Sequence, residues 1–100
     1  MKIKEKKENG KLTVAVEGKI DSSTAPELEK KIKSEIGECS ALIFDFEKLD
    51  YISSAGLRIL LGAQKLMGNR NMKVINVNET VNDIFDVTGF SYILDIEIMQ

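Results

Sequence analysis

The sequence of 100 residues contains no histidine, and this absence limits the chemistry open to the chain. Histidine is the commonest general base in enzymes and the commonest neutral metal ligand. A Ser-His-Asp or Cys-His catalytic site is therefore excluded within this chain. The glycine-rich loop and lysine of nucleotide-binding proteins are missing as well. We expect a protein that is not an enzyme and that uses neither a metal ion nor a cofactor.

Cysteine, long apolar runs and an excess of positive charge are also scarce. Cys39 is the only cysteine, so no disulfide can form within the chain, as is usual in a reducing cytoplasm. We interpret it as a partly buried apolar residue, because no histidine can activate its thiol. No stretch approaches the roughly 20 apolar residues of a membrane span, and no apolar signal segment follows the N-terminus. The net charge of -2 offers no basic surface for nucleic acid, so we expect a cytoplasmic protein that binds neither membrane nor nucleic acid.

What is present fits an ordinary folded chain, with 43% apolar and 30% charged residues. One hundred residues suffice for one hydrophobic core, so we expect a single domain over residues 1–100. Asn9-Gly10 between two alternating segments predicts an opening β-hairpin. Thr24 and Glu27 have the spacing of a capping box, which predicts a helix that ends near Gly37.

The remaining chain alternates between strand and helix patterns. Residues 41–46 are almost continuously apolar, as in a central strand covered on both faces. A helix after residue 54, a strand at 72–77, a short helix between Asn78 and Gly89, and a strand at 92–98 follow. The order ββαβαβαβ predicts an α/β fold with a mixed, mostly parallel five-stranded sheet and about three helices. No C-terminal helix, or only a very short one, is expected after the fifth strand.

Two weaker candidates for function are the carboxylates and one glycine. Asp45, Glu47 and Asp50 could form a cation site, but we interpret them as a strand end and an ordinary charged loop. Gly56 follows a strand and opens a helix, as in phosphate-binding loops, yet a lone glycine more simply allows close packing against the sheet or a partner. A small enzyme using Asp21 or Asp45 is a hypothesis that no cofactor motif supports.

Ser53 and Ser54 stand where a loop meets the strongly apolar second helix. One serine is the usual N-cap, whose hydroxyl accepts a hydrogen bond from a free backbone N–H. The second serine allows either a structural or a functional interpretation. Loops at the carboxyl ends of parallel strands usually carry function, and this junction is expected there.

Three segments of the sequence together resemble the STAS domain family, specifically the bacterial anti-sigma factor antagonists. They are Gly18-Lys19-Ile20-Asp21, the run from Leu49 to Leu57 with its Ser-Ser-Ala-Gly-Leu motif, and Val87-Thr88-Gly89-Phe90. The resemblance covers essentially the whole chain in the same element order. It implies a regulator that binds a serine-kinase anti-sigma factor, frees a sigma factor, and is inactivated by phosphorylation.

Aligned on Gly56, the resemblance implies Ser54 as the phosphorylated residue, with Ser53 as a minor alternative because it stands where the family often has aspartate. A phosphatase would reverse the modification. The partner-binding residues implied by this comparison and by the exposed stripe of the second helix are Asp21, Ser22, Ser23, Ser53, Ser54, Gly56, Arg58 and Gly62. The free protein is expected to be a monomer. The alternative is a STAS adaptor subunit of another signalling or lipid-transport complex, which phosphorylation does not regulate.

Overall fold

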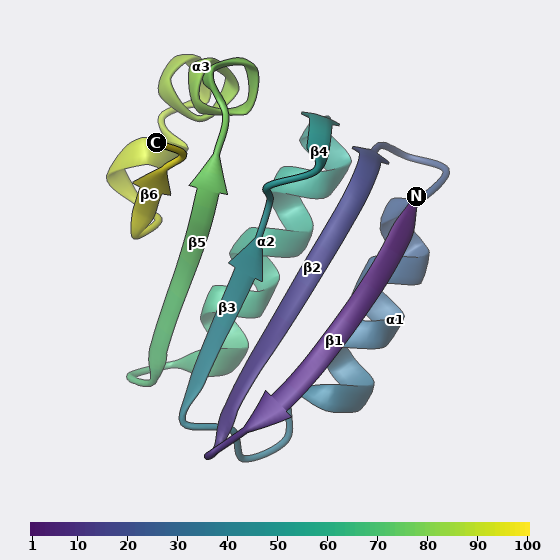
Figure 1. Ribbon diagram of the computed structural model, residues 1–100, viewed down its shortest axis with the longest axis vertical. Helices are drawn as coiled ribbons and strands as arrows, with labels where there is room; N and C mark the ends of the chain where they lie inside the picture. Colours follow the sequence, from purple (N-terminus) through teal and green to yellow (C-terminus); the bar gives the residue numbers. More distant parts are fainter.

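Six strands and three helices make up the chain, and a computed structural model describes all residues from 1 to 100. The strand order is β1-β2-β3-β5-β6, with β1 antiparallel to β2 and the other neighbours parallel (Figure 1). The predicted mixed, mostly parallel α/β fold with three helices is therefore confirmed, with one strand more than expected. The elements in chain order are β1 (Lys2–Glu8), β2 (Lys11–Ile20), α1 (Ala25–Glu35), β3 (Ala41–Asp45), β4 (Leu49–Ile52), α2 (Ser54–Met67), β5 (Asn71–Val77), α3 (Glu79–Thr88), the 3₁₀ turn η1 (Phe90–Tyr92) and β6 (Ile96–Ile98).

The additional strand is β4, which pairs with the last residues of β2 and lies outside the main strand order. The interpretation of Glu47 and Asp50 as an ordinary charged loop was wrong for Asp50, which lies within β4. Only the two ends of β4 are buried, so its four residues lack the alternation that marks a half-buried strand. The strand forms because β2 extends beyond the end of β3 and its free backbone groups need a partner.

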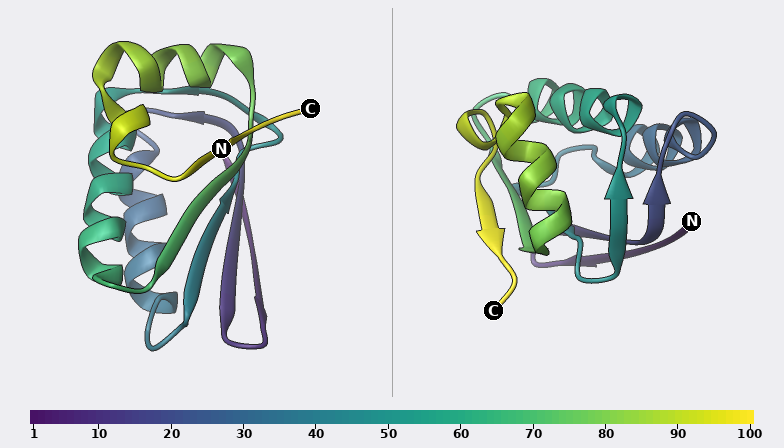
Figure 2. Two further views of the ribbon diagram at one scale, coloured as in Figure 1. Left: turned by 90° about the vertical axis from the view of Figure 1, so that its left-hand side faces the viewer. Right: turned by 90° about the horizontal axis from the view of Figure 1, so that it is seen from above.

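Helices α1 and α2 lie side by side on one face of the sheet, and α3 lies across one end of it (Figure 2). The prediction that β3 is covered on both faces was therefore wrong. Leu42, Phe44 and Phe46 are fully buried beneath the helices, whereas Ile43 on the other face is only half-buried. The core therefore lies between the helices and this one face of the sheet. Burial of each large side chain there stabilises the fold by about 1.5–3 kcal/mol.

Local signals placed most of the turns correctly. Asn9 and Gly10 both have positive φ, 52° and 80°, as a type I′ hairpin requires. Gly89 adopts φ 81° and ends α3. The last strand begins later than the predicted residue 92, because Phe90–Tyr92 continue from Gly89 as a 3₁₀ turn. No helix follows β6 within the 100 residues.

Arg70 joins the C-terminal ends of the two packed helices, a role that sequence analysis did not predict. Its guanidinium donates hydrogen bonds to the backbone oxygens of Gly37, Cys39 and Leu66, each at 2.9 Å, and of Met67 at 3.1 Å. Carbonyl groups at helix C-termini lack partners within the helix, and a cation there also complements the helix dipole. At this end of the sheet the guanidinium of Arg70 therefore bonds backbone oxygens at or just after the C-terminal ends of the two helices.

Candidate functional site

The carboxyl ends of β2 and β4 run together, which brings two polar loops next to each other (Figure 1). Ile20 pairs with Ile52 in parallel register, and the next residue, Ser53, donates its N–H to the oxygen of Ile20 at 2.8 Å. The loop that begins at Asp21 therefore lies beside the start of α2. Both loops carry residues that the sequence analysis expects to bind the partner.

Asp21 holds the first loop in a fixed shape. Its Oδ1 accepts hydrogen bonds from the hydroxyl of Ser23 at 2.7 Å and from the backbone N–H groups of Ser23 and Thr24 at 2.9 and 3.1 Å. The Ser23 hydroxyl, with these N–H groups, lowers the pKa of Asp21 below its ordinary value, because hydrogen bonds to a carboxylate favour the charged form. The carboxylate thus organises this loop.

The predicted capping box at the start of α1 is not formed. Thr24 is the N-cap residue, but its side chain makes no capping hydrogen bond. Its hydroxyl instead accepts the N–H of Asp21 at 2.8 Å and donates to the oxygen of Lys19 at 3.0 Å. The hydroxyl is used to close the loop between β2 and α1, so it is not available to the helix.

Ser53 occupies the N-cap position of α2 without acting as a cap. Its backbone is extended, with φ -92° and ψ 177°, yet its side chain accepts no hydrogen bond from the first turn. The Oγ atom is buried and has no hydrogen-bond partner. A buried hydroxyl of this kind is turned away from the surface, which makes Ser53 a poorer acceptor for a modifying enzyme than its neighbour.

Ser54 is the first residue of α2 and is exposed. The first backbone N–H in α2 with an acceptor is that of Leu57, which bonds the oxygen of Ser53 at 2.9 Å. The N–H groups of Ser54, Ala55 and Gly56 have no acceptor outside the helix, and helix geometry provides none within it. The helix turn that Ser54 begins therefore has three free donors and the positive end of the helix dipole, an environment that favours negative charge.

Gly56, one of the residues expected to bind the partner, is buried and packs against the sheet. A Cβ at this position would lie 2.6 Å from Cγ1 of Ile52 and 2.7 Å from Cγ2 of Ile20, closer than side chains tolerate. The prediction that this glycine permits close packing of the first turn on the sheet is confirmed. Gly56 lets α2 begin directly on the ends of β2 and β4.

The other predicted contact residues lie at or near the surface. Ser22, Ser23, Ser54 and Arg58 are exposed, while Asp21 and Gly62 are half-buried. Arg58 and Gly62 follow Ser54 at intervals of four residues, so they share one side of α2 with it. Two loops and one helix stripe thus present the predicted site as an open surface.

Of the three carboxylates considered as a cation site, that of Asp45 is engaged by other groups of the chain. Asp45 Oδ1 accepts hydrogen bonds from the N–H of Glu47 at 3.1 Å and from Nδ2 of Asn76 at 3.0 Å. No three histidine, cysteine, aspartate or glutamate side chains are grouped so that they could hold a metal ion. Asp45 therefore serves as a local turn acceptor next to β5.

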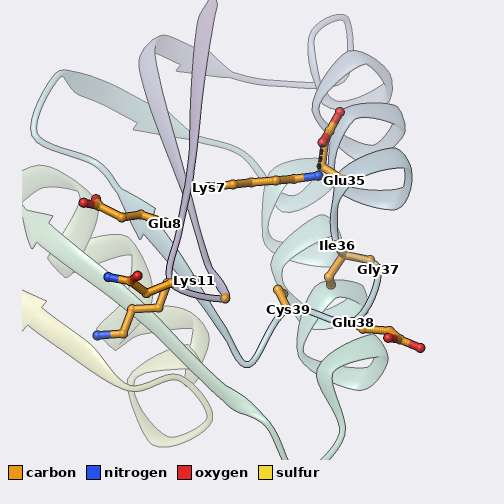
Figure 3. Close-up of a pocket in the computed structure, with 10 residues that line it drawn as sticks. Lys7, Glu8, Lys11, Glu35, Ile36, Gly37, Glu38 and Cys39 are labelled. Atoms are coloured by element: carbon orange, nitrogen blue, oxygen red, sulfur yellow. Dashed lines mark ion pairs between the residues drawn. The ribbon is translucent and has the colours of Figure 1, made fainter.

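A hollow of about 400 Å³ lies between the hairpin and the C-terminal end of α1, away from Ser54 (Figure 3). Lys7 Nζ and Glu35 Oε2 form an ion pair at 2.7 Å across it, which raises the pKa of Lys7 and lowers that of Glu35. Cys39 lines the same hollow, and its sulfur lies 3.9 Å from the sulfur of Met67. One ion pair and the hydrogen bonds of Arg70 join the elements at this end of the molecule, which does not extend the candidate site.

The structure is a small α/β domain whose predicted site is an open polar surface at the start of α2. Residues 2–98 match the model of the STAS domain, and the chain belongs to the STAS domain family. The resemblance found in the sequence is thereby confirmed. No helix of the chain is long and apolar enough to cross a membrane.

Several proteins with similar sequences or structures are named as anti-sigma factor antagonists. The anti-sigma-B factor antagonist of Listeria monocytogenes is 27% identical over 103 residues, covering 100% of this chain and 90% of its own. The crystal structure of an anti-sigma factor antagonist from Mycobacterium paratuberculosis has a TM-score of 0.88 at 24% identity, covering 96% and 84% of the two chains. Two structures of the Bacillus protein SpoIIAA are also similar. The unphosphorylated form has a TM-score of 0.81 at 19% identity, covering 95% of this chain and 87% of its own. The phosphorylated form has a TM-score of 0.72 at 18% identity, covering 95% of this chain and 90% of its own.

Proposed function

We propose that the chain is an anti-sigma factor antagonist, which binds a serine-kinase anti-sigma factor and thereby frees a sigma factor. The kinase inactivates the antagonist by transferring the γ-phosphoryl group of ATP to Oγ of Ser54, releasing ADP and the hydroxyl proton. A phosphatase hydrolyses the phosphoserine and restores binding. Membership of the STAS family and the names of the relatives support this proposal.

One observation carries the choice of residue. Ser54 is exposed and begins a helix turn whose three backbone N–H groups have no partners, whereas the Oγ of Ser53 is buried. Phosphorylation adds about -1.5 to -2 charges at neutral pH, and a helix N-terminus stabilises such an anion. We therefore assign Ser54 as the acceptor in preference to Ser53.

The same charge opposes docking while it leaves the fold intact. A dianion buried in an interface loses its hydration and repels acidic groups on the partner. The hydroxyl of Ser54 makes no hydrogen bond within the chain, so its modification breaks no internal contact. Control by phosphorylation thus acts on the docking surface and needs no refolding.

The decisive experiment is phosphorylation by the kinase-type anti-sigma factor of the same organism. Incubation with ATP should add one phosphoryl group, detected as a mass increase, to the wild type and to Ser53→Ala, but none to Ser54→Ala. Unchanged incorporation in Ser54→Ala would refute the assignment.

A second measurement tests the blocked interface. Ser54→Asp should retain the circular dichroism spectrum and unfolding midpoint of the wild type and bind the anti-sigma factor at least tenfold more weakly. Ser54→Asn, which has nearly the same size but no charge, is the matched control. Equal binding of the aspartate and asparagine variants would contradict an electrostatic block.

The adaptor function remains the alternative, motivated by the serine at position 53 where the family often has aspartate. It predicts that no kinase-type anti-sigma factor binds the chain and that phosphate is never incorporated. A pull-down that recovers other complexes and no such kinase would favour the adaptor.

A further inference from the structure

An apolar groove between α1 and α2 begins at Ile59, five residues after Ser54. Its volume is about 180 Å³, and it is lined by Glu29, Ile32, Lys33, Ile59, Gly62, Ala63 and Leu66. The large side chain of Leu66 is 49% exposed at its edge. An apolar cavity of about 150 Å³ accommodates benzene, so this groove has room for one large apolar side chain from outside.

Gly62 keeps the groove open. No atom lies within 4 Å of the position that a Cβ would take there, so the glycine is not required by the packing of α1 against α2. Glycine in a helix interior costs up to about 1 kcal/mol relative to alanine, which makes an unexplained glycine on α2 a feature to be accounted for. An approaching partner side chain accounts for it.

The charged side chains that α2 presents near the groove are all positive. The chain has no acidic residue between Asp50 and Glu79, while Arg58 and Lys65 are exposed on the same side of α2 as Ser54. Neither takes part in any of the ion pairs of the chain. On the α1 side, Glu29 and Lys33 pair with each other at 3.8 Å and contribute no net charge. The surface therefore combines an apolar hollow with two unpaired positive charges.

We propose that this groove receives an apolar side chain from an acidic segment of the protein partner. The proposal rests on the function proposed above, because the partner is the anti-sigma factor that docks beside Ser54. The apolar anchor fills the space over Gly62, and acidic side chains next to it pair with Arg58 and Lys65. Phosphate on Ser54 shares this side of the helix, so it lowers the positive potential that attracts the acidic segment.

A peptide titration tests the chemistry of the groove without the anti-sigma factor. The probe is a synthetic amphipathic helix with leucine anchors flanked by glutamates, added to ¹⁵N-labelled protein. We expect amide shifts concentrated at Ile59, Gly62 and Leu66, and affinity at least tenfold weaker for the same peptide with lysines in place of glutamates. Shifts elsewhere, no shifts, or equal affinity of the two peptides would overturn the proposal.

Variants of the chain then test the groove against the anti-sigma factor. Gly62→Phe should fill the groove and weaken binding at least tenfold, and Gly62→Ala, which adds only a methyl group over the groove, should weaken binding less. The circular dichroism spectrum of both variants should match that of the wild type. Arg58→Glu and Lys65→Glu should each weaken binding at least tenfold, mainly by slowing association, and the loss should shrink in high salt. Lys30→Glu, which makes the same charge change outside the groove, is the control and should bind unchanged.

The outcomes separate this inference from the proposed function. If Ser54→Asp weakens binding and Gly62→Phe does not, the groove is not part of the interface and the proposed function stands. If no anti-sigma factor binds the wild type, the proposed function fails, and the peptide titration alone decides whether the groove takes an acidic apolar segment.

Discussion

The N-termini of α2 and α3 have almost the same backbone but opposite hydrogen bonding. Each follows a strand, and each N-cap residue is extended, with ψ 177° at Ser53 and 172° at Asn78. Asn78 Oδ1 accepts the N–H of Val81 at 2.8 Å, and its Nδ2 donates to the oxygen of Leu49 at 2.7 Å. The hydroxyl of Ser53 makes no hydrogen bond at all.

This difference separates a structural helix start from one that is available to a ligand or a modification. At α3 the side chain of Asn78 stabilises the helix and ties it to β4, and the N–H of Val81 in the first turn is already bonded to Asn78. At α2 the first N–H groups stay free, and the helix is held in place by its apolar side and by the close approach of Gly56 to the sheet. We expect changes in packing to lower the free energy of unfolding most at the start of α2, and changes in capping to lower it most at the start of α3.

Gly56→Ala should cause the largest loss of unfolding free energy. The new methyl group would collide with buried branched side chains of Ile20 and Ile52, and such overpacking typically costs about 1–3 kcal/mol of unfolding free energy. Urea denaturation followed by circular dichroism measures the loss. Gly62→Ala is the matched control in the same helix and should be stabilised by about 0.5–1 kcal/mol, because its Cβ meets no atom. Equal midpoints for the two variants would show that α2 is not held by this approach.

Asn78→Ala should lower the free energy of unfolding by about 1–2 kcal/mol, since it removes the cap of α3. It also leaves the oxygen of Leu49 without its side-chain donor. Asn78→Asp retains the capping acceptor and loses only the amide donor, so it should recover part of the loss. Urea denaturation of both variants checks this order, and an alanine variant as stable as the wild type would remove the contrast between the two helix starts.

Features that depend on short-range signals could be predicted from the sequence. Asn9-Gly10 determined the hairpin, and Asn78 and Gly89 marked the two ends of α3. The two serines and the apolar periodicity that follows them placed the start of α2 to within one residue of Ser54. In each case the relevant contacts lie within a few residues along the chain, where turn and capping chemistry operate.

Features that depend on contacts between distant residues could not be predicted from the sequence. β4 forms because β2 is longer than β3, and Arg70 bonds carbonyl groups more than 30 residues away in Gly37 and Cys39. The assignment of Ser54 rather than Ser53 came from a family resemblance, since burial of the Ser53 hydroxyl depends on how the loop packs. The groove beside Gly62 likewise requires knowledge of how α1 lies against α2.

A smaller effect is expected from the loop that borders α2. The pKa of Asp21 is lowered by the Ser23 hydroxyl, so its contribution to stability is fully present above the ordinary pKa of 3.8 and is lost as the pH falls through the lower, folded-state value. A ¹³C NMR titration of the carboxyl group should give a pKa below 3.8. Ser23→Ala should raise that pKa toward the ordinary value, and an unchanged pKa would show that Ser23 does not hold the loop.

The smallest effect should come from Ser53→Ala, the change that would be costly if Ser53 capped α2 as Asn78 caps α3. Loss of a serine cap costs about 0.5–2 kcal/mol, but the Ser53 hydroxyl has no bond to lose. Its removal also relieves the desolvation of a buried polar atom. We therefore expect the unfolding free energy to stay within about 0.5 kcal/mol of the wild type or to rise slightly. A loss as large as that of Asn78→Ala would show that both helices are capped alike, and the free N–H groups assigned to a phosphate at Ser54 would then be already occupied.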